Sequence, residues 1–185
     1  AVFADYMRAR ELHRASTRES LEQASQLLAR VVAVDDRYGP GWRLLAQNHA
    51  RQAWLGYLPL HQGFAKARAA VQRAIEIDAT DAAAIAVLAG LSRSYDMNLP
   101  EAARMLKQAV ARSAEDETVL GAVGSLTMTT GDGPRTIAAF KQLVRRDPLN
   151  GGAWGGLGFA YIVFDRHDDA IAALRKALEL EPDAV

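Results

Sequence analysis

The sequence predicts an all-α protein in which five helical hairpins stack into a right-handed α-solenoid. Half of its 185 residues are hydrophobic and 24% are charged, a balance that excludes a wholly disordered chain. Apolar residues recur at helical spacing along the chain, and no segment shows the alternation typical of a strand. The pattern itself recurs about every 34 residues, the spacing of stacked helical hairpins. Together these observations predict the solenoid.

Ten helices are expected in order, paired into hairpins. Their predicted ranges are 3–14, 17–34, 41–54, 61–78, 82–95, 99–113, 117–130, 134–146, 151–164 and 168–181. Ser16 with Glu19 forms a predicted capping box that opens the second helix. Pro134 suits the first turn of the eighth helix. Pro182 ends the last helix, because the residue before a proline avoids the α conformation.

The repeated pattern is clearest in residues 151–184. Apolar and small residues alternate there at helical spacing on two helices, which a proline follows: Trp154, Leu157, Gly158, Tyr161, Ala170, Leu174, Ala177 and Pro182. The four preceding units keep the small and apolar places less completely: Ala9, Ala24 and Leu28, then Trp42, Leu45 and Ala67, then Leu88, Ala102 and Leu106, then Gly124, Phe140 and Leu143. Gly158 and Ala170 are small where the two helices of a hairpin come closest.

This pattern resembles the tetratricopeptide repeat (TPR). The resemblance implies a single TPR domain over residues 1–185, with repeats at about 3–38, 39–81, 82–116, 117–150 and 151–184. An opening Tyr-x-x-Ala helix, a long loop in the second unit and an Ala-rich helix at 64–70 narrow the resemblance. They are similar to the C-terminal TPR regions of bacterial adenylate/guanylate cyclases and of winged-helix transcription regulators. We therefore expect a fragment of a longer, cytoplasmic signalling protein.

Composition and motifs argue against catalysis in this chain. The 22 basic and 22 acidic side chains balance, which disfavours nucleic-acid binding, and no apolar run is long enough for a membrane span. Cysteine is absent, and His13, His49, His61 and His167 show no metal-ligand spacing, so they are expected to be solvated or capping residues. The Gly-rich stretch 151–158 follows no strand, unlike a nucleotide-binding loop. We predict no enzyme activity, no metal and no cofactor.

The resemblance places the candidate function in the concave groove, where the first helix of each repeat faces a partner. The implied groove residues are Arg10, Arg14, Arg43, Gln47, Arg51, Ala86, Gly90, Arg93, Gly121, Ser125, Met128, Gly155, Phe159 and Ile162. The set is Arg-rich at its beginning and small or apolar at its end. It favours a protein or peptide that is acidic at one end and apolar at the other. The alternative interpretation is a face of arginines that are merely solvated.

The C-terminal helix presents a second candidate surface. Its apolar stripe would pack on a following repeat and comprises Leu174, Ala177, Leu178 and Leu180. An uncovered stripe of this kind predicts a two-fold homodimer through this end. Three functional classes stay open: an interaction scaffold, an oligomerisation or spacer module attached to a catalytic or DNA-binding domain outside the chain, and an enzyme whose catalytic domain lies outside the chain.

Overall fold

The computed structural model describes residues 2–182, and ten α-helices account for most of them. They are α1 (Val2–Ala15), α2 (Arg18–Val34), α3 (Gly39–Trp54), α4 (Leu60–Ile77), α5 (Ala82–Ser94), α6 (Leu99–Ser113), α7 (Glu117–Thr129), α8 (Gly133–Arg146), α9 (Gly151–Val163) and α10 (His167–Leu180). The described residues contain no strand. The predicted all-α solenoid is confirmed, and every predicted helix boundary lies within two residues of the observed one.

Side chains at the helix starts explain these accurate boundaries. Asp81, Asn98, Asp116, Asp132 and Asn150 each cap the following helix by accepting a hydrogen bond from one of its first backbone N–H groups. Such caps satisfy donors that a helix cannot pair internally.

The predicted capping box of α2 is wrong. Thr17, not Ser16, accepts the hydrogen bond from the backbone N–H of Ser20. Ser16 has a φ of +56°, and its hydroxyl donates to the carbonyls of His13 and Arg14 at the end of α1. The side chain of Ser16 therefore caps the C-terminal end of α1, and Thr17 caps the N-terminal end of α2.

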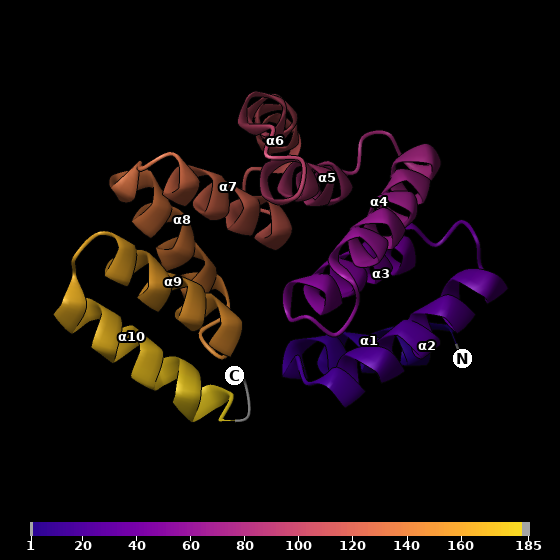
Figure 1. Cartoon of the computed structure of the whole chain (residues 1–185), viewed down its shortest axis with the longest axis horizontal. Helices are drawn as coiled ribbons and strands as arrows, with labels where there is room; N and C mark the ends of the chain where they lie inside the picture. The colour runs from indigo at the N-terminus through magenta and orange to yellow at the C-terminus, as the bar shows by residue number, and fades with distance from the viewer. Residues whose placement is uncertain (1, 183–185) are drawn as a thin grey trace.

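The five hairpins curve into an arc whose two ends approach each other (Figure 1). The helices of each hairpin pack together, and consecutive hairpins pack on one another along the arc. Three clusters of buried side chains follow one another in the same direction, so the core is elongated rather than central. The C-terminal end of α10 comes to lie opposite α1 and α3 (Figure 1). The arc thereby encloses a concave space.

Neighbouring side chains explain the glycine-rich sequence of α9. A Cβ atom at Gly156 would lie 2.6 Å from the Phe140 ring, and one at Gly158 would lie 2.6 Å from Leu174 Cγ. A Cβ atom at Gly151 would lie 2.7 Å from the Glu181 side chain. Gly155, by contrast, has nothing within 4 Å of the same position. Close packing by Phe140 of α8 and Leu174 of α10 thus explains Gly156 and Gly158, the second of which the sequence predicted as a small place, while at Gly151 the flexible side chain of Glu181 could move aside.

The helices are too short or too polar for a bilayer. Within residues 2–182, none of them combines the length and the apolar character needed to cross a membrane.

Candidate partner-binding groove

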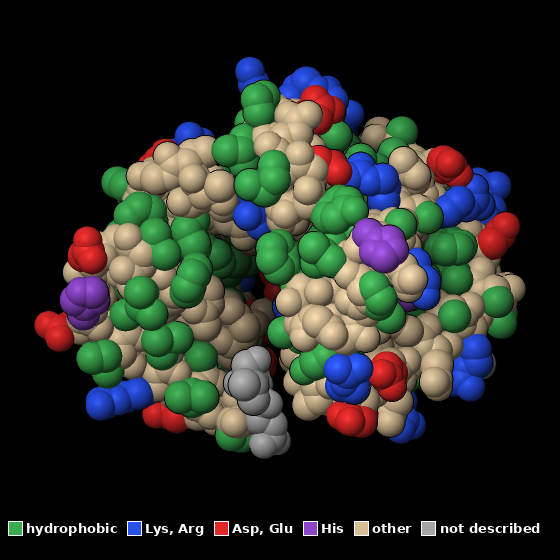
Figure 2. Space-filling view, in the orientation of Figure 1, with side chains coloured by type: hydrophobic (Ala, Val, Ile, Leu, Met, Phe, Trp, Pro, Cys, Tyr) green, Lys and Arg blue, Asp and Glu red, His purple; other side chains and the backbone are tan. Residues whose placement is uncertain are grey.

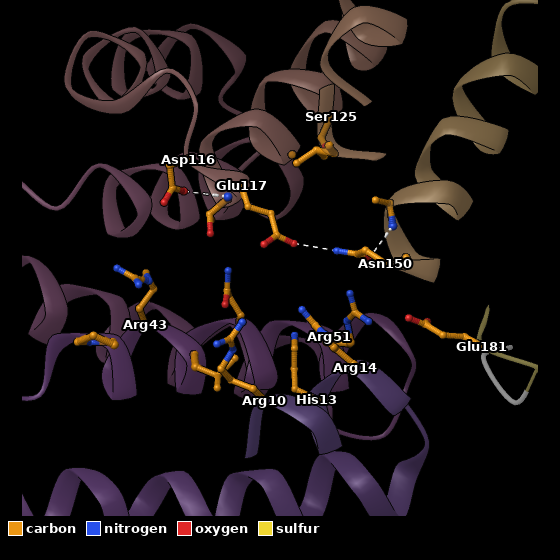
Figure 3. Close-up of a pocket in the computed structure, with 18 of the residues that line it drawn as sticks. Arg10, His13, Arg14, Arg43, Arg51, Asp116, Glu117, Ser125, Asn150 and Glu181 are labelled. Carbon is orange, nitrogen blue, oxygen red and sulfur yellow. Dashed lines mark hydrogen bonds between the residues drawn. The ribbon is translucent and has the colours of Figure 1, made fainter. Parts of the chain in front are cut away.

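The concave side of the arc holds a cavity of about 560 Å³ between two unlike walls (Figure 3). One wall comes from α1 and α3 and is rich in cationic and polar side chains: Arg10, His13, Arg14, Arg43, Gln47 and Arg51. The opposite wall comes from α7, α8, the start of α9 and the segment after α10, and its polar side chains are Asp116, Glu117, Ser125, Asn150 and Glu181. A space-filling view shows the same hollow between the two halves of the molecule (Figure 2). The groove is therefore cationic on one side and acidic on the other.

Arg43 has a structural partner within the chain. Its guanidinium lies 2.5 Å from the carboxylate of Asp81, and both side chains are largely buried. Asp81 also caps α5 through the backbone N–H of Ala84. Arg43 thus ties α3 to α5, and its charge is already balanced.

Two other arginines of this wall, Arg10 and Arg51, form no ion pair with a carboxylate of the described residues, and a third, Arg14, forms only long ones. Arg10 donates to the thioether of Met7 at 3.8 Å, and Arg51 donates to the hydroxyl of Ser16. Arg14 reaches Glu11 and Asp147 only at 4.0 and 3.9 Å. The surrounding walls desolvate the guanidinium of Arg51 and lower its pKa, while the charge of Glu181 acts in the opposite direction on that pKa. A carboxylate of a bound partner would stabilise such a cation, because charge-assisted hydrogen bonds are stronger than hydrogen bonds between neutral groups.

His13 is a neutral member of the same wall. Its Nδ1 lies 3.0 Å from Oδ1 of the fully buried Asn48. Burial lowers the pKa of His13 to about 4, and the charge of Arg51 contributes to the lowering. At neutral pH the ring therefore donates Nδ1–H to Asn48 and leaves the positive charge of the wall to the arginines.

The expectation that all four histidines are solvated or capping residues is wrong for two of them. His13 packs on Asn48, and His49 has a buried Nδ1 without a hydrogen-bond partner among the described residues. Burial lowers the pKa of His49 to about 4, with the charge of Lys66 as a smaller cause. His61 and His167 are exposed. No group of potential metal ligands occurs in residues 2–182.

The acidic wall was missed from sequence. Asp116 caps α7 through the N–H groups of Thr118 and Val119, and Glu117 accepts a hydrogen bond of 2.9 Å from Asn150 Nδ2. The TPR resemblance had assigned the groove to places within the first helices and not to the residues that start them. The capping residues Asp116, before 117–130, and Asn150, before 151–164, could have indicated these side chains from the sequence.

The remaining predicted groove residues occupy different places. Arg10, Arg14, Gln47, Arg51, Gly121 and Ser125 line the main cavity with Arg43. Gly90 and Arg93 border a small crevice against α6 and α7, and Arg93 lies 3.3 Å from the hydroxyl of Thr129.

Ala86 is only 1% exposed and therefore offers a partner almost no surface. Met128 packs against the core of the last two repeats, whereas Phe159 and Ile162 are exposed and line neither this cavity nor the next.

A second cavity, of about 620 Å³, adjoins the first where the ends of the arc meet. Its apolar walls come from Trp54 and Leu55 at the end of α3 and from Leu174, Ala177 and Leu178 on α10, with Gly155 between them. Three residues of the predicted self-association stripe therefore face a cavity shared with the N-terminal half. Leu180 is partly exposed and does not line it.

The comparisons with known proteins agree with this architecture. Residues 127–185 match the family model described as tetratricopeptide repeat. No curated protein sequence matches the chain. Among solved structures, the chain is similar to TTC0263, a thermophilic TPR protein of Thermus thermophilus, with 18% identity, a TM-score of 0.70, and 98% of this chain and 92% of that chain covered.

Two further structures share the fold. Human IFIT1, solved as a dimer with m7Gppp-AAAA, has 15% identity and a TM-score of 0.72, with 88% of this chain and 40% of that chain covered. YrrB, described as a TPR protein with an unusual peptide-binding site, has 16% identity and a TM-score of 0.53, with 89% and 80% covered. The chain therefore has the fold of TPR proteins, and its C-terminal part matches the tetratricopeptide repeat family in sequence.

Proposed function

We propose that this chain is a non-catalytic protein–protein interaction scaffold that binds a segment of a partner in its concave groove. The observation that carries the proposal is an open cavity with a cationic wall on α1 and α3 and an acidic wall opposite. TPR proteins of this fold include one described as having a peptide-binding site. The described residues hold no cluster of metal ligands, and the histidine that lines the groove is committed to Asn48.

The two walls define the chemistry of the partner segment. Acidic side chains of the partner would lie against Arg10 and Arg51, which lack a close carboxylate among the described residues. Basic or amide side chains would lie against Glu117 and Asp116 on the other wall. A segment rotated about its long axis would place like charges together, and such juxtaposition costs binding energy. The groove would therefore fix which face of the bound segment turns to each wall.

Peptide selection tests this function directly. Random peptides displayed on phage are selected against the immobilised chain, and the enriched peptides are then measured in solution. Arg10→Glu with Arg51→Glu is expected to weaken binding at least about tenfold, because each lost charged hydrogen bond is worth about 1.5–3 kcal/mol. Arg30→Glu with Arg175→Glu makes the same charge change at positions outside the groove and is expected to retain the affinity. Absence of any enriched peptide, or equal losses in both double variants, would refute the proposal.

The finer assignment concerns the protein that carries this domain. A regulatory TPR region of a bacterial signalling protein is supported by the order of motifs in the first two repeats, including the Ala-rich stretch within α4. An oligomerisation or spacer module attached to a cyclase or DNA-binding domain is the alternative. Sequencing the gene on both sides of the region that encodes this chain decides between them.

Self-association through the last repeat is a second candidate function. It is favoured by exposed apolar side chains on α10, where Leu178 is 57% and Ile171 is 50% exposed, and by the apolar surface over α9 and α10 (Figure 2). Sedimentation of the wild type and of a Leu174→Glu, Leu178→Glu variant tests it. A concentration-dependent dimer that the variant abolishes is the expected result. A wild type that remains monomeric at high concentration contradicts this candidate.

A further inference from the structure

The polar groove and the apolar cavity form one continuous site. Arg14, Arg51, Gly152 and Glu181 line both of them, so the charged groups sit where the two cavities meet. Each cavity has a volume within the range usual for ligand sites. A ligand that spans the junction would contact cations on one side and apolar side chains on the other.

The apolar cavity has a supported wall rather than loose side chains. Trp54 is 61% exposed. Its ring packs edge-on against the ring of Phe64, with 6.0 Å between the ring centroids, and the ring of Phe64 stacks on that of Tyr95, with 4.6 Å between the centroids. Aromatic pairs of this geometry stabilise each other beyond simple burial. Across the cavity, Leu178 also exposes most of its side chain. Two large apolar side chains, one from α3 and one from α10, thus line the same cavity.

Glu181 occupies the junction as an internal carboxylate. Its side chain lies over Gly151, where a Cβ atom would come within 2.7 Å of Glu181 Cγ and Cδ. Figure 3 shows the carboxylate directed toward the side on which Arg14 and Arg51 lie, and its charge acts to raise the pKa of Arg51. Among the described residues, Glu181 nevertheless forms no ion pair with Arg14 or Arg51, because the ion pairs of Arg14 within 4.0 Å are with Glu11 and Asp147. Glu181 therefore supplies a long-range countercharge without a direct bond.

We infer that the junction binds an acidic residue and a neighbouring large apolar residue of the partner segment. This inference rests on the proposed function and names the part of the segment that anchors it. The acidic side chain pairs with Arg51 and Arg14 and takes over the role of Glu181 as the countercharge of Arg51. The apolar side chain fills the cavity between Trp54 and Leu178. Charge complementarity at the junction selects this occupant over a purely apolar one, which would cover the guanidinium groups of Arg14 and Arg51 without offering them a carboxylate.

The same selection of displayed peptides tests the inference through the sequences that it enriches. Peptides that combine Asp or Glu with Leu, Phe or Trp within a few positions are expected to predominate. The variant Glu181→Gln removes the internal carboxylate and is expected to tighten their binding severalfold. Trp54→Ser with Leu178→Ser is expected to weaken it at least about tenfold, as expected when apolar anchors of an interface are truncated. Phe159→Ser is the matched control, because Phe159 is similarly exposed but lies outside both cavities.

The outcomes separate this inference from the proposed function. Enriched peptides that lack the acidic–apolar combination, or that bind Trp54→Ser, Leu178→Ser as tightly as wild type, overturn the inference and leave the scaffold function standing. Selection of no peptide at all overturns both. Circular dichroism of each variant verifies that the fold is retained. A wild-type dimer in sedimentation that the Trp54 and Leu178 substitutions dissolve would assign the apolar cavity to a second copy of the chain, which also overturns the inference.

Discussion

Replacing Gly158 with valine is expected to lower the free energy of unfolding by about 3 kcal/mol, as overpacking of a tight core does. A Cβ atom at this position would lie 2.6 Å from Leu174 Cγ, 2.7 Å from Leu174 Cδ2 and 3.3 Å from the backbone nitrogen of Leu174. The side chain of Leu174 could rotate away, but the backbone of α10 could not. The last hairpin would have to open to accept the new side chain.

The same helix offers a matched control three residues earlier. Gly155→Val introduces the same atoms where nothing lies within 4 Å of the new Cβ, so its effect on stability is expected to stay within about 0.5 kcal/mol, the range of surface substitutions. Urea unfolding followed by circular dichroism measures both variants. Equal destabilisation by the two valines would show that α9 is disturbed by β-branching itself and not by contact with α10.

The sequence was sufficient for the fold because the signals that determine it are local. Trp154 and Leu157 mark the buried face of a helix by their spacing, and Pro182 marks its end. Capping residues such as Asn98 and Asp116 begin helices through bonds to backbone groups only three residues away. Each of these signals acts over about one helical turn, so the helix boundaries could be predicted from the repeat pattern and the capping residues.

The groove could be predicted only in part, because its chemistry depends on contacts between consecutive repeats. His13 meets Asn48, Arg43 meets Asp81, and Arg51 meets Ser16. The partners in each pair are 35 to 38 positions apart, which is about one repeat. When the first helix of one repeat was interpreted alone, no partner was evident for its arginines, and its histidines were expected to be solvated. Pairing polar residues across one repeat length would have identified Arg43 as a structural side chain.

The acidic wall and the apolar cavity depend on a longer-range property. Glu181 faces Arg51, and Leu178 faces Trp54, because the whole arc curves far enough to bring its ends together. That curvature is the sum of small rotations between successive repeats. No local pattern encodes it, so the sequence assigned Leu178 to a self-association stripe, whereas in the structure Leu178 and Trp54 line the same cavity.

The stability of the chain is expected to fall as the pH is lowered from about 6.5 toward 4. His13 and His49 each have a folded-state pKa lowered to about 4 from an ordinary value of 6.5, chiefly because burial disfavours the charged ring. Between these values the unfolded chain binds a proton at each ring and the folded chain does not. The free energy of unfolding is therefore highest above pH 6.5 and falls as the pH approaches 4. Each histidine contributes up to about 1.4 kcal/mol per pH unit to this fall.

Paired variants assign this pH dependence to the two buried rings. His13→Gln with His49→Gln is expected to flatten the unfolding profile between pH 6.5 and 4.5, because glutamine does not titrate and can still donate to Asn48. His61→Gln with His167→Gln, at exposed positions, is expected to leave the slope as in wild type. Urea unfolding at a series of pH values supplies the measurement. An unchanged slope in the first variant would show that both rings accept protons in the folded chain.

The groove provides a further check on His13 alone. The charge of Arg51 is the second cause of its lowered pKa, so Arg51→Gln is expected to raise that pKa without changing the burial of the ring. A carboxylate bound to Arg51 would act in the same direction, since it offsets the same charge. Nuclear magnetic resonance titration of the His13 ring, with and without a bound acidic peptide, would therefore report occupancy of the cationic wall. A His13 pKa that is indifferent both to Arg51→Gln and to the peptide would mean that burial and Asn48 alone set it.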